Sequence, residues 1–275
     1  MFDTETYLAR LGHTGPVQAD LQTLRELHRK HMINIPFDNS LNAQRGAYIW
    51  DFVDIDVDAT FDAVVTGGRG GVCFELGGLF QRLLEELGFD VDLLSAGVRG
   101  PDGEFGPDLE HLFHCVHLDG QVWLVDVGLS GPSFTEPLLV SDEVQTQFGV
   151  EYRTVAEGGY RVLQRKPPAA ADWQDVYRFS LEPRKLSEWS RDASGQANAD
   201  AEPGEGSELE KYGTALLSSL VNNGTVMHSR AFETGQMMLV GRRFLKVDNG
   251  QEKVRVLIDP VEYAAVVKDI LHQDA

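Results

Sequence analysis

Cys73 is the residue whose surroundings in the sequence most favour chemistry. It follows Gly70-Gly71 and begins a stretch in which apolar residues recur every three or four positions, which indicates an amphipathic helix. In the first turn of a helix, free N–H groups and the positive end of the helix dipole favour the thiolate form of a thiol. The preceding glycines would let a substrate approach the backbone, whose N–H groups suit an oxyanion. The alternative is a buried structural cysteine.

A second group of reactive side chains lies around Asp119-Gly120, a dipeptide typical of a two-residue type I′ turn between alternating strands. Such a turn places Cys115 opposite Leu124 and His111 diagonal to Asp126 on one face of the sheet. A carboxylate at that position orients an imidazole and stabilises its protonated form. Together with the thiol, this pair is a candidate triad of nucleophile, base and orienting acid. A loop of odd length would instead put the pair on opposite faces.

The same strand has an alternative interpretation as a metal site, because His111, His114, Cys115 and His117 are all zinc-ligand types. On a strand, however, His114 points away from the other three, and His111 and His117 are separated by about 20 Å. One ion cannot bind all four residues. We therefore expect no metal site, with His114 and His117 as ordinary strand residues and Cys115 in the core.

Helices and strands are predicted on both sides of these residues. Asp20 is suited to begin a helix whose leucines and histidines recur along one stripe as far as His31. The helix that begins at Cys73 is predicted to end before Gly88, a residue suited to the C′ position. From Val91 onward the apolar period becomes two, which predicts strands.

The later part of the chain is predicted to be mixed. We expect strands over 160–164, 176–181, 237–240 and 244–247, a hairpin at 248–250, and helices over 208–221 and from Asp259-Pro260 onward. Residues 191–210 carry no aromatic or large aliphatic side chain before Leu209, which is typical of a surface linker. A helical part, then a β part, then a mixed part favours an α+β arrangement over a doubly wound sheet.

The composition excludes several classes of protein. The chain has 275 residues, 43 of them acidic and 24 basic, which gives a net charge of −19. This charge repels phosphate backbones and anionic lipid surfaces, so we expect neither nucleic acid nor a membrane as partner. Two cysteines cannot form a disulfide framework, the first residues do not resemble a secretory signal, and no apolar run is long enough to span a membrane. We therefore expect a cytoplasmic protein.

Three motifs resemble those of the arylamine N-acetyltransferases. Arg69 to Leu76 is similar to the RGGxCFE signature of that family, Ile35 to Asn39 to its IPFEN segment, and Val125 to Gly128 to its DVG motif. The spacings of 38 residues from Cys73 to His111 and 15 from His111 to Asp126 fit the family's Cys-His-Asp triad. The resemblance covers residues 1 to about 165.

The resemblance implies a fold of three parts with a cysteine-proteinase-like core. These parts are a helical bundle over 1–90, an antiparallel β-barrel over 91–190 and, after a linker over 191–207, an α/β lid over 208–275. It also implies that Cys73 takes an acyl group from a thioester and passes it to an amine. His111 would draw the thiol proton and Asp126 would hold His111, with no tightly bound cofactor.

The resemblance also implies supporting residues around the triad. Arg69 would pair with Asp38 or Asn39 beneath the site, and Glu75 would be either a first-turn helix charge or a second partner of Arg69. The residues expected to contact substrate or acyl donor are Phe37, Gly71, Val72, Phe74, Gly128, Leu129 and Ser130. For Phe37 and Phe74, a plain core position is the alternative.

The residues after the DVG motif differ from the acetyl-coenzyme A users of the family. Those enzymes usually continue with FGG, whereas this chain has Leu129-Ser130-Gly131. This continuation, and the segment Val144 to Gln147, are similar to the amide-synthase branch, which closes ansamycin-type polyketides into macrolactams. There the donor is a polyketide thioester on the phosphopantetheine of an acyl carrier protein, and the amine is an arylamine in the same molecule.

Three alternatives remain beside the amide synthase. An arylamine acetyltransferase would use acetyl-coenzyme A as donor. A transglutaminase-like thiol hydrolase would use the same order of Cys, His and Asp with water or lysine as acceptor. A binding module that kept the fold but lost the reaction would have an unreactive Cys73.

Overall fold

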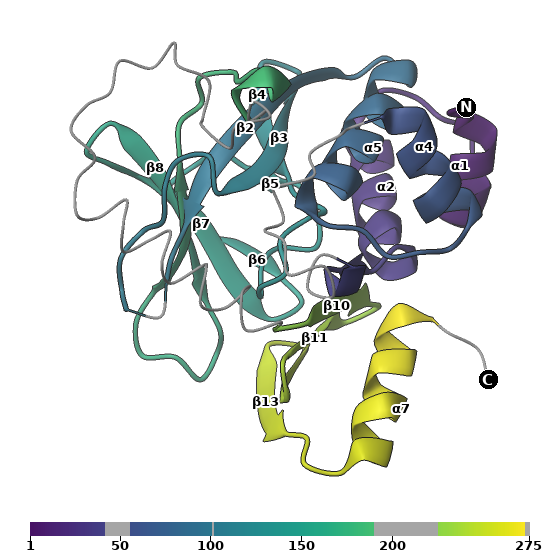
Figure 1. Ribbon diagram of the computed structural model, residues 1–275. Helices are drawn as coiled ribbons and strands as arrows, with labels where there is room; N and C mark the ends of the chain where they lie inside the picture. Colours follow the sequence, from purple (N-terminus) through teal and green to yellow (C-terminus); the bar gives the residue numbers. More distant parts are fainter. Residues whose placement is uncertain (42–55, 101, 190–224, 273–275) are drawn as a thin grey trace, which may run out of the picture.

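The computed structural model describes residues 1–41, 56–100, 102–189 and 225–272. It is an α+β protein in which a group of helices, an antiparallel barrel and a C-terminal layered part follow one another along the chain (Figure 1). The helices before the barrel are α1 (Thr4–Arg10), α2 (Leu21–Asn34), α4 (Val57–Phe61) and α5 (Cys73–Glu86), and a π-helical turn, η2 (Asp62–Thr66), follows α4 directly. Among the described helices, none is long and apolar enough to cross a membrane.

The two predicted helices of this region are confirmed. The Asp20 carboxylate accepts the Thr23 N–H at 2.8 Å and so begins α2. Gly88 follows α5 with a φ of +86°, a left-handed conformation that glycine adopts without strain. The apolar faces of α2 and α5 lie in one buried cluster, which fixes the N-terminus of α5 in space.

The barrel is a single sheet of eight strands with every neighbouring pair antiparallel. Its strands are β2 (Asp90–Val98), β3 (His111–Leu118), β4 (Gln121–Val125), β5 (Leu138–Leu139), β6 (Gln145–Gln147), β7 (Val150–Glu157), β8 (Tyr160–Lys166) and β9 (Gln174–Phe179), in the order β5-β4-β3-β2-β9-β8-β7-β6. The 3-10 turn η3 (Leu186–Trp189) follows.

The predicted hairpin register is confirmed. Asp119 and Gly120 have φ values of +53° and +75°, as a type I′ turn requires, and Cys115 lies opposite Leu124. The predicted even-length turn therefore sets the faces of β3 and β4.

Two glutamine side chains connect the first and last strands of the barrel order. Gln145 on β6 accepts the Leu139 N–H at 2.9 Å and donates to the Leu139 carbonyl at 2.8 Å, as a neighbouring strand would. Gln147 accepts the N–H groups of Thr135 and Glu136 and donates to the Glu136 carbonyl. These side chains take the place of a backbone ladder, and the barrel is nearly closed.

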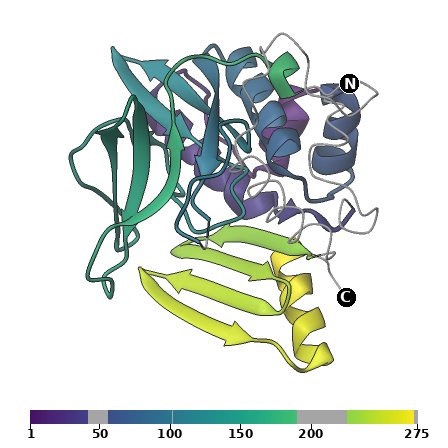
Figure 2. The same ribbon diagram turned by 60° about the vertical axis from the view of Figure 1, so that its left-hand side comes forward.

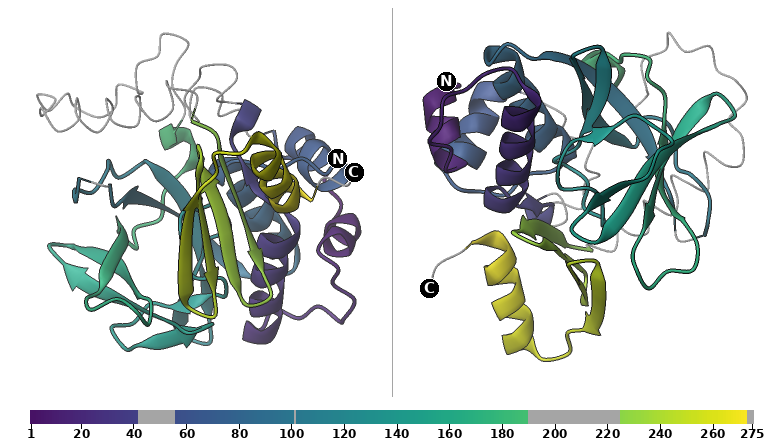
Figure 3. Two further views of the ribbon diagram at one scale, coloured as in Figure 1. Left: turned by 90° about the horizontal axis from the view of Figure 1, so that it is seen from below. Right: turned by 180° about the vertical axis from the view of Figure 1, so that it is seen from behind.

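The described C-terminal part, residues 225–272, here called the lid, is a sheet backed by a helix. Its own elements are β10 (Met227–Phe232), β11 (Gly235–Val240), β12 (Arg243–Asp248), β13 (Gln251–Val256) and α7 (Pro260–Leu271). Figures 2 and 3 show this sheet with α7 along one face and the barrel toward the other. Asp259 caps α7 as predicted, whereas the expected linker and the helix over 208–221 lie outside the described residues.

One strand of the lid sheet comes from the helical part. The two residues of β1 (Phe37–Asp38) pair with Ser229 and His228 of β10 and form the edge of the order β1-β10-β11-β12-β13. The first ninety residues were expected to be helical throughout. The structure differs from this expectation at β1. A strand of two residues is too short to show a periodic pattern in the sequence.

Candidate active site

Cys73 is the first residue of α5 and is 5% exposed. The chain before it is fixed against β1, because the Gly71 N–H donates to the Pro36 carbonyl at 3.1 Å and the Asp38 N–H donates to the Gly71 carbonyl at 2.9 Å. A Cβ at Gly70 would lie 2.6 Å from the Cβ of Asp38. The glycine pair is thus explained by close packing of the chain on itself, and the thiol lies at the positive end of the α5 dipole.

Glu75 organises the first turn of α5. Its Oε2 accepts the Val72 N–H at 3.1 Å, and its Oε1 forms an ion pair with Arg69. Arg69 therefore has a different partner from the expected Asp38 or Asn39 among the described residues. Glu75 is therefore both a first-turn helix charge and the ion-pair partner of Arg69. A carboxylate in the first turn is drawn toward the helix N-terminus, where Arg69 lies.

Asp38 and Asn39 hold the lid against the helical part. Oδ1 of Asp38 lies 3.1 Å from Nδ1 of His228 on β10. The Asn39 amide oxygen accepts the Met227 N–H at 2.7 Å, at the start of the same strand. Asp38 and Asn39 were expected to support the site by pairing with Arg69, but they pair with β10 of the lid instead.

His111 and Asp126 meet as the hairpin register predicted. Nε2 of His111 lies 2.8 Å from Oδ2 of Asp126, and both side chains are buried. This leaves Nδ1 as the ring nitrogen available to Cys73, whose thiol interacts with the imidazole. Burial alone would lower the pKa of His111, but Asp126, and then Cys73, outweigh it and raise that pKa to about 10. The imidazole is therefore protonated at neutral pH, and a positive charge faces the sulfur.

The other carboxylate oxygen of Asp126 fixes the loop that covers Cys73. Oδ1 accepts the N–H groups of Gly128 and Leu129, each at 3.1 Å. Burial would raise the pKa of Asp126, yet His111 and the Gly128 N–H keep it below its usual value. A Cβ at Gly128 would lie 2.7 Å from the Cα of Cys73, so the loop lies directly on the residue that carries the thiol.

His28 on α2 holds the backbone of Asp126. Its Nε2 accepts the Asp126 N–H at 3.0 Å, so Nδ1 must carry the proton and donates to the Thr135 carbonyl, also at 3.0 Å. Burial lowers the pKa of His28 to about 4, which keeps this ring neutral. The Thr135 N–H is in turn held by Gln147, so one chain of hydrogen bonds runs from the barrel closure to the candidate triad.

Tyr177 on β9 is a further neighbour of the pair. Its ring centroid is 5.9 Å from that of His111, and the residue is fully buried. Burial, and then the Asp126 charge, raise the pKa of Tyr177 well above its usual value, so a neutral hydroxyl lies beside the carboxylate. The sequence contained no signal for this contact.

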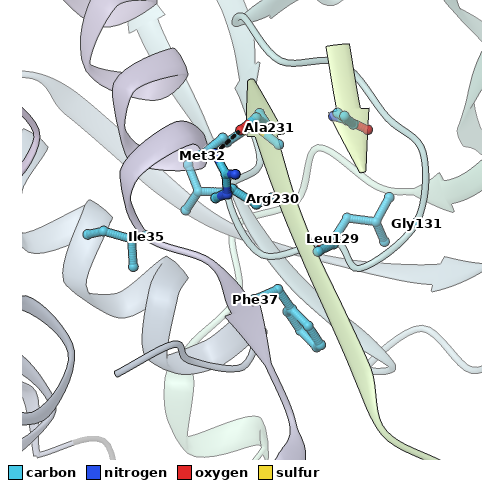
Figure 4. Close-up of a pocket in the computed structure, with 10 residues that line it drawn as sticks. Met32, Ile35, Phe37, Leu129, Gly131, Arg230 and Ala231 are labelled. Atoms are coloured by element: carbon cyan, nitrogen blue, oxygen red, sulfur yellow. Dashed lines mark hydrogen bonds between the residues drawn. The ribbon is translucent and has the colours of Figure 1, made fainter. Parts of the chain in front are cut away.

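A pocket of about 310 Å³ lies between the helical part, the loop after β4 and the lid (Figure 4). Of the residues expected to contact substrate, Phe37 and Leu129 line it. Its other lining residues are Met32, Ile35, Val127, Gly131, Ser229, Arg230, Ala231 and Gln236.

The remaining expected contacts lie elsewhere. Val72 and Phe74 are buried in the helical core, and a Cβ at Gly71 would meet Leu76 at 2.9 Å. Gly128 packs on Cys73, and the Ser130 hydroxyl donates to the Met227 sulfur at 3.9 Å. These positions shape the surroundings of the thiol rather than the wall of this pocket.

Known proteins resemble this chain in sequence and in fold. The sequence model of a family described as N-acetyltransferase matches residues 20–202, and the chain is 36% identical to an arylamine N-acetyltransferase of Escherichia coli over 66% of this chain and 63% of that protein. The chain belongs to the arylamine N-acetyltransferase family. As a member of that family it is an acyltransferase. It is also 40% identical to proansamycin X synthase of Amycolatopsis mediterranei, over 100% of this chain and 98% of that protein.

Solved structures of the arylamine N-acetyltransferase family share the fold. The Mycobacterium marinum enzyme in complex with CoA superposes with a TM-score of 0.77 at 26% identity and covers 98% of this chain and 92% of that one. The Salmonella typhimurium enzyme gives 0.75 at 23% identity over 99% and 92%. The likeness thus extends to the lid, beyond the motifs of the first 165 residues.

Proposed function

We propose that this protein is an amide synthase that closes a polyketide macrolactam through an acyl-cysteine at Cys73. The observation that carries the acyl transfer is the buried arrangement in which Asp126 holds His111 and His111 faces Cys73. Histidine and cysteine placed in this way form a thiolate–imidazolium pair, and the thiolate is the nucleophilic form.

The first half of the reaction loads the enzyme. The Cys73 sulfur attacks the carbonyl carbon of the donor thioester, and the bond from that carbon to the donor sulfur breaks. His111 gives its proton to the departing thiol, while Asp126 stabilises the imidazole orientation throughout. The products are acyl-Cys73, a free donor thiol and a neutral His111.

The second half forms the amide. The nitrogen of an arylamine attacks the acyl carbon, the bond to the Cys73 sulfur breaks, and His111 accepts the proton that the nitrogen loses. The cysteine returns as thiolate beside a protonated imidazole. Cys73 and Asp126 are 5% and 2% exposed, which limits the access of water to the acyl-enzyme.

The choice of the amide-synthase branch is supported by one comparison and one residue. Identity to proansamycin X synthase extends over the whole chain, lid included, and that protein's name refers to the synthesis of an ansamycin. Leu129 lines the pocket with a flexible aliphatic side chain. The acetyl-coenzyme A users of the family usually have an aromatic residue at this position. We propose a carrier-protein phosphopantetheine thioester as donor and a reducing cytoplasm as location, where free thiols persist.

The test offers the full-length enzyme two substrates in parallel. One is a long acyl thioester that ends in an arylamine, and the other is acetyl-coenzyme A with a separate simple arylamine. We expect an acyl adduct on Cys73 by mass spectrometry and cyclic amide from the first substrate, with slow acetylation in the second. Fast acetylation would favour the acetyltransferase, and free acid without amide would favour the hydrolase.

Cys73→Ser is predicted to remove turnover, by about 10³-fold or more, because a hydroxyl at this site is a far weaker nucleophile than a thiolate. Cys115→Ser is the matched control, since the chain has two cysteines and the other is not at the site. It should keep its adduct and its turnover. Failure of the wild-type thiol to react with an alkylating reagent would instead identify a binding module.

A further inference from the structure

Three side chains at one end of the barrel, where β2 begins and β3 ends, converge on one point. Asp92 on β2 lies directly opposite Cys115 on β3, and His117 is two residues further along β3, on the same face. Oδ2 of Asp92 is 2.7 Å from Nε2 of His117, and Sγ of Cys115 is 3.9 Å from that same nitrogen. All three donor atoms lie within 4.8 Å of one another, and no other such group of three occurs among the described residues.

This group is not a second catalytic triad. A triad needs the two ring nitrogens of histidine, one for the nucleophile and one for the carboxylate. Here Nε2 of His117 faces both the sulfur and the carboxylate, so no proton can pass through the ring from one to the other. Three electron-pair donors that surround a common point are the arrangement of a metal site.

The structure also separates this group from the other histidines of β3. His111 is bound to Asp126, and His114, on the opposite face, has its Nε2 3.1 Å from Oε1 of Gln81. One ion therefore cannot bind every histidine and cysteine of the strand. A ligand from β2 was not expected, because the register of β2 with β3 carries no local signal in the sequence.

We propose that Asp92, Cys115 and His117 form a binding site for a divalent transition-metal ion, with zinc as the preferred metal. One sulfur, one imidazole nitrogen and one carboxylate oxygen form a donor set typical of zinc, and a fourth position stays open to water. Zinc bond lengths place tetrahedral donor atoms about 3.3–3.6 Å apart. The present separations are 2.7 Å, 3.9 Å and, between Cys115 and Asp92, at most 4.8 Å, so side-chain movements of about 1 Å bring the donors to that range.

The three ligands combine one buried sulfur with two side chains that are open to solvent. Cys115 is 1% exposed, whereas the side chains of His117 and Asp92 are 41% and 33% exposed. An ion can therefore enter from solvent past His117 and meet a fixed sulfur. Because all three ligands lie on two paired strands, the bound metal would bridge β2 and β3.

Binding requires the Cys115 thiol to release its proton to solvent as the sulfur–metal bond forms. Metal binding should therefore release a proton, because the thiolate and not the thiol is the ligand.

The metal has no part in acyl transfer in this proposal. Cys115 is four residues from His111 along β3, a separation of about 13 Å on an extended strand. We expect the ion to stabilise the barrel, and the test can fail or succeed independently of the proposed function.

The experiment uses full-length Cys73→Ser, in which Cys115 is the only cysteine. We expect one cadmium or zinc ion per chain, a cadmium–thiolate absorption band, and a melting temperature raised by zinc. All three should disappear when Cys115→Ser is added. Asp92→Asn, which preserves the side-chain shape, should weaken binding at least tenfold. His272→Ala, which removes an exposed histidine at the C-terminal end of α7, is the matched control.

Two results would overturn the site. One is metal binding that survives Cys115→Ser, which would mark adventitious surface binding. The other is binding no tighter than millimolar in a Cys73→Ser protein that melts like the wild type. Turnover of Cys115→Ser on the wild-type background should be unchanged, which separates loss of the metal from loss of the catalytic thiol.

Discussion

His28 positions Asp126 through the backbone rather than through the carboxylate. Its two hydrogen bonds join the Asp126 N–H to the Thr135 carbonyl, and its ring stacks on Phe134 at a centroid distance of 5.7 Å. A neutral, doubly engaged imidazole at this place keeps the end of β4 fixed relative to α2. The orientation of Asp126, and hence of His111, depends on it.

His28→Ala is therefore predicted to lower kcat about 10²-fold with little change in KM, since small displacements of catalytic groups have effects of this size. It also leaves a buried donor and a buried acceptor unpaired, at about 1–3 kcal/mol each. His28→Gln, which can donate and accept, should restore part of both. Steady-state kinetics and urea unfolding measure the two effects, and an unchanged kcat in a stably folded His28→Ala protein would remove the positioning role.

The pKa of His111 predicts how stability depends on pH. Because the folded-state pKa of about 10 is above the ordinary value of 6.5, this group stabilises the fold fully below about pH 6.5. That contribution is lost as the pH rises through about 10. The melting temperature of the wild type should therefore fall more steeply between pH 6.5 and 10 than that of His111→Gln. Parallel curves for the two proteins would contradict the raised pKa.

At the scale of elements, the site depends on how closely the loop after β4 lies on the start of α5. A Cβ at Gly128 would lie 2.7 Å from the Cα of Cys73 and 3.0 Å from its Cβ. Gly128→Ala should therefore push the loop away and slow acylation of Cys73 at least tenfold. Gly131→Ala is the matched control in the same loop, because nothing lies within 4 Å of its added Cβ. Acylation rates by mass spectrometry compare them, and equal slowing would refute the close-packing argument.

The elements that a local signal defines could be predicted from the sequence. Asp119-Gly120 set the register of β3 and β4, and that register brought His111 to Asp126. Asp20 and Gly88 marked helix ends for the same reason, since capping depends on a few adjacent residues.

What escaped prediction depends on contacts between distant segments. His28 was placed on a buried helix stripe, but its partner is 98 residues away. Asp92 meets Cys115 through a pairing whose connection carries no short turn signal. Arg69 was expected to pair with Asp38 or Asn39, and it pairs with Glu75. The choice among nearby polar partners depends on packing, which the spacing of residues does not reveal. The domain limits remain a prediction.

At the scale of the whole molecule, a second pocket lies between the lid and the barrel beside the first, with about 290 Å³ of space that is partly open to solvent. Gln236 of β11 lines both cavities, and its amide is held on Ser133 by bonds of 3.2 Å to the N–H and 3.0 Å to the carbonyl. This side chain therefore forms part of the wall between the two spaces.

Gln236→Ala is predicted to join the cavities and to favour long acyl chains. Each additional buried methylene contributes about 0.8 kcal/mol, or about fourfold, so two of them should raise kcat/KM for a long acyl thioester relative to an acetyl one by at least about tenfold. Gln236→Met, of nearly the same volume and, like alanine, without the amide, should leave the ratio unchanged. An unchanged ratio in Gln236→Ala would show that acyl chains do not extend past this residue.

The short strand β1 has a consequence for the order in which the chain folds. Phe37 and Asp38 pair with Ser229 and His228, and Asn39 binds Met227, 188 residues later. Closing so long a loop is slow compared with forming α2, α5 or the β3–β4 hairpin. On a ribosome these local elements can form early, and the segment before Cys73 can already pair with Phe37, but β1 itself acquires its strand partner only once β10 has been made. We therefore expect the growing chain to carry its thiol in an unfinished site, and to become reactive toward thioesters only after β10 has joined β1.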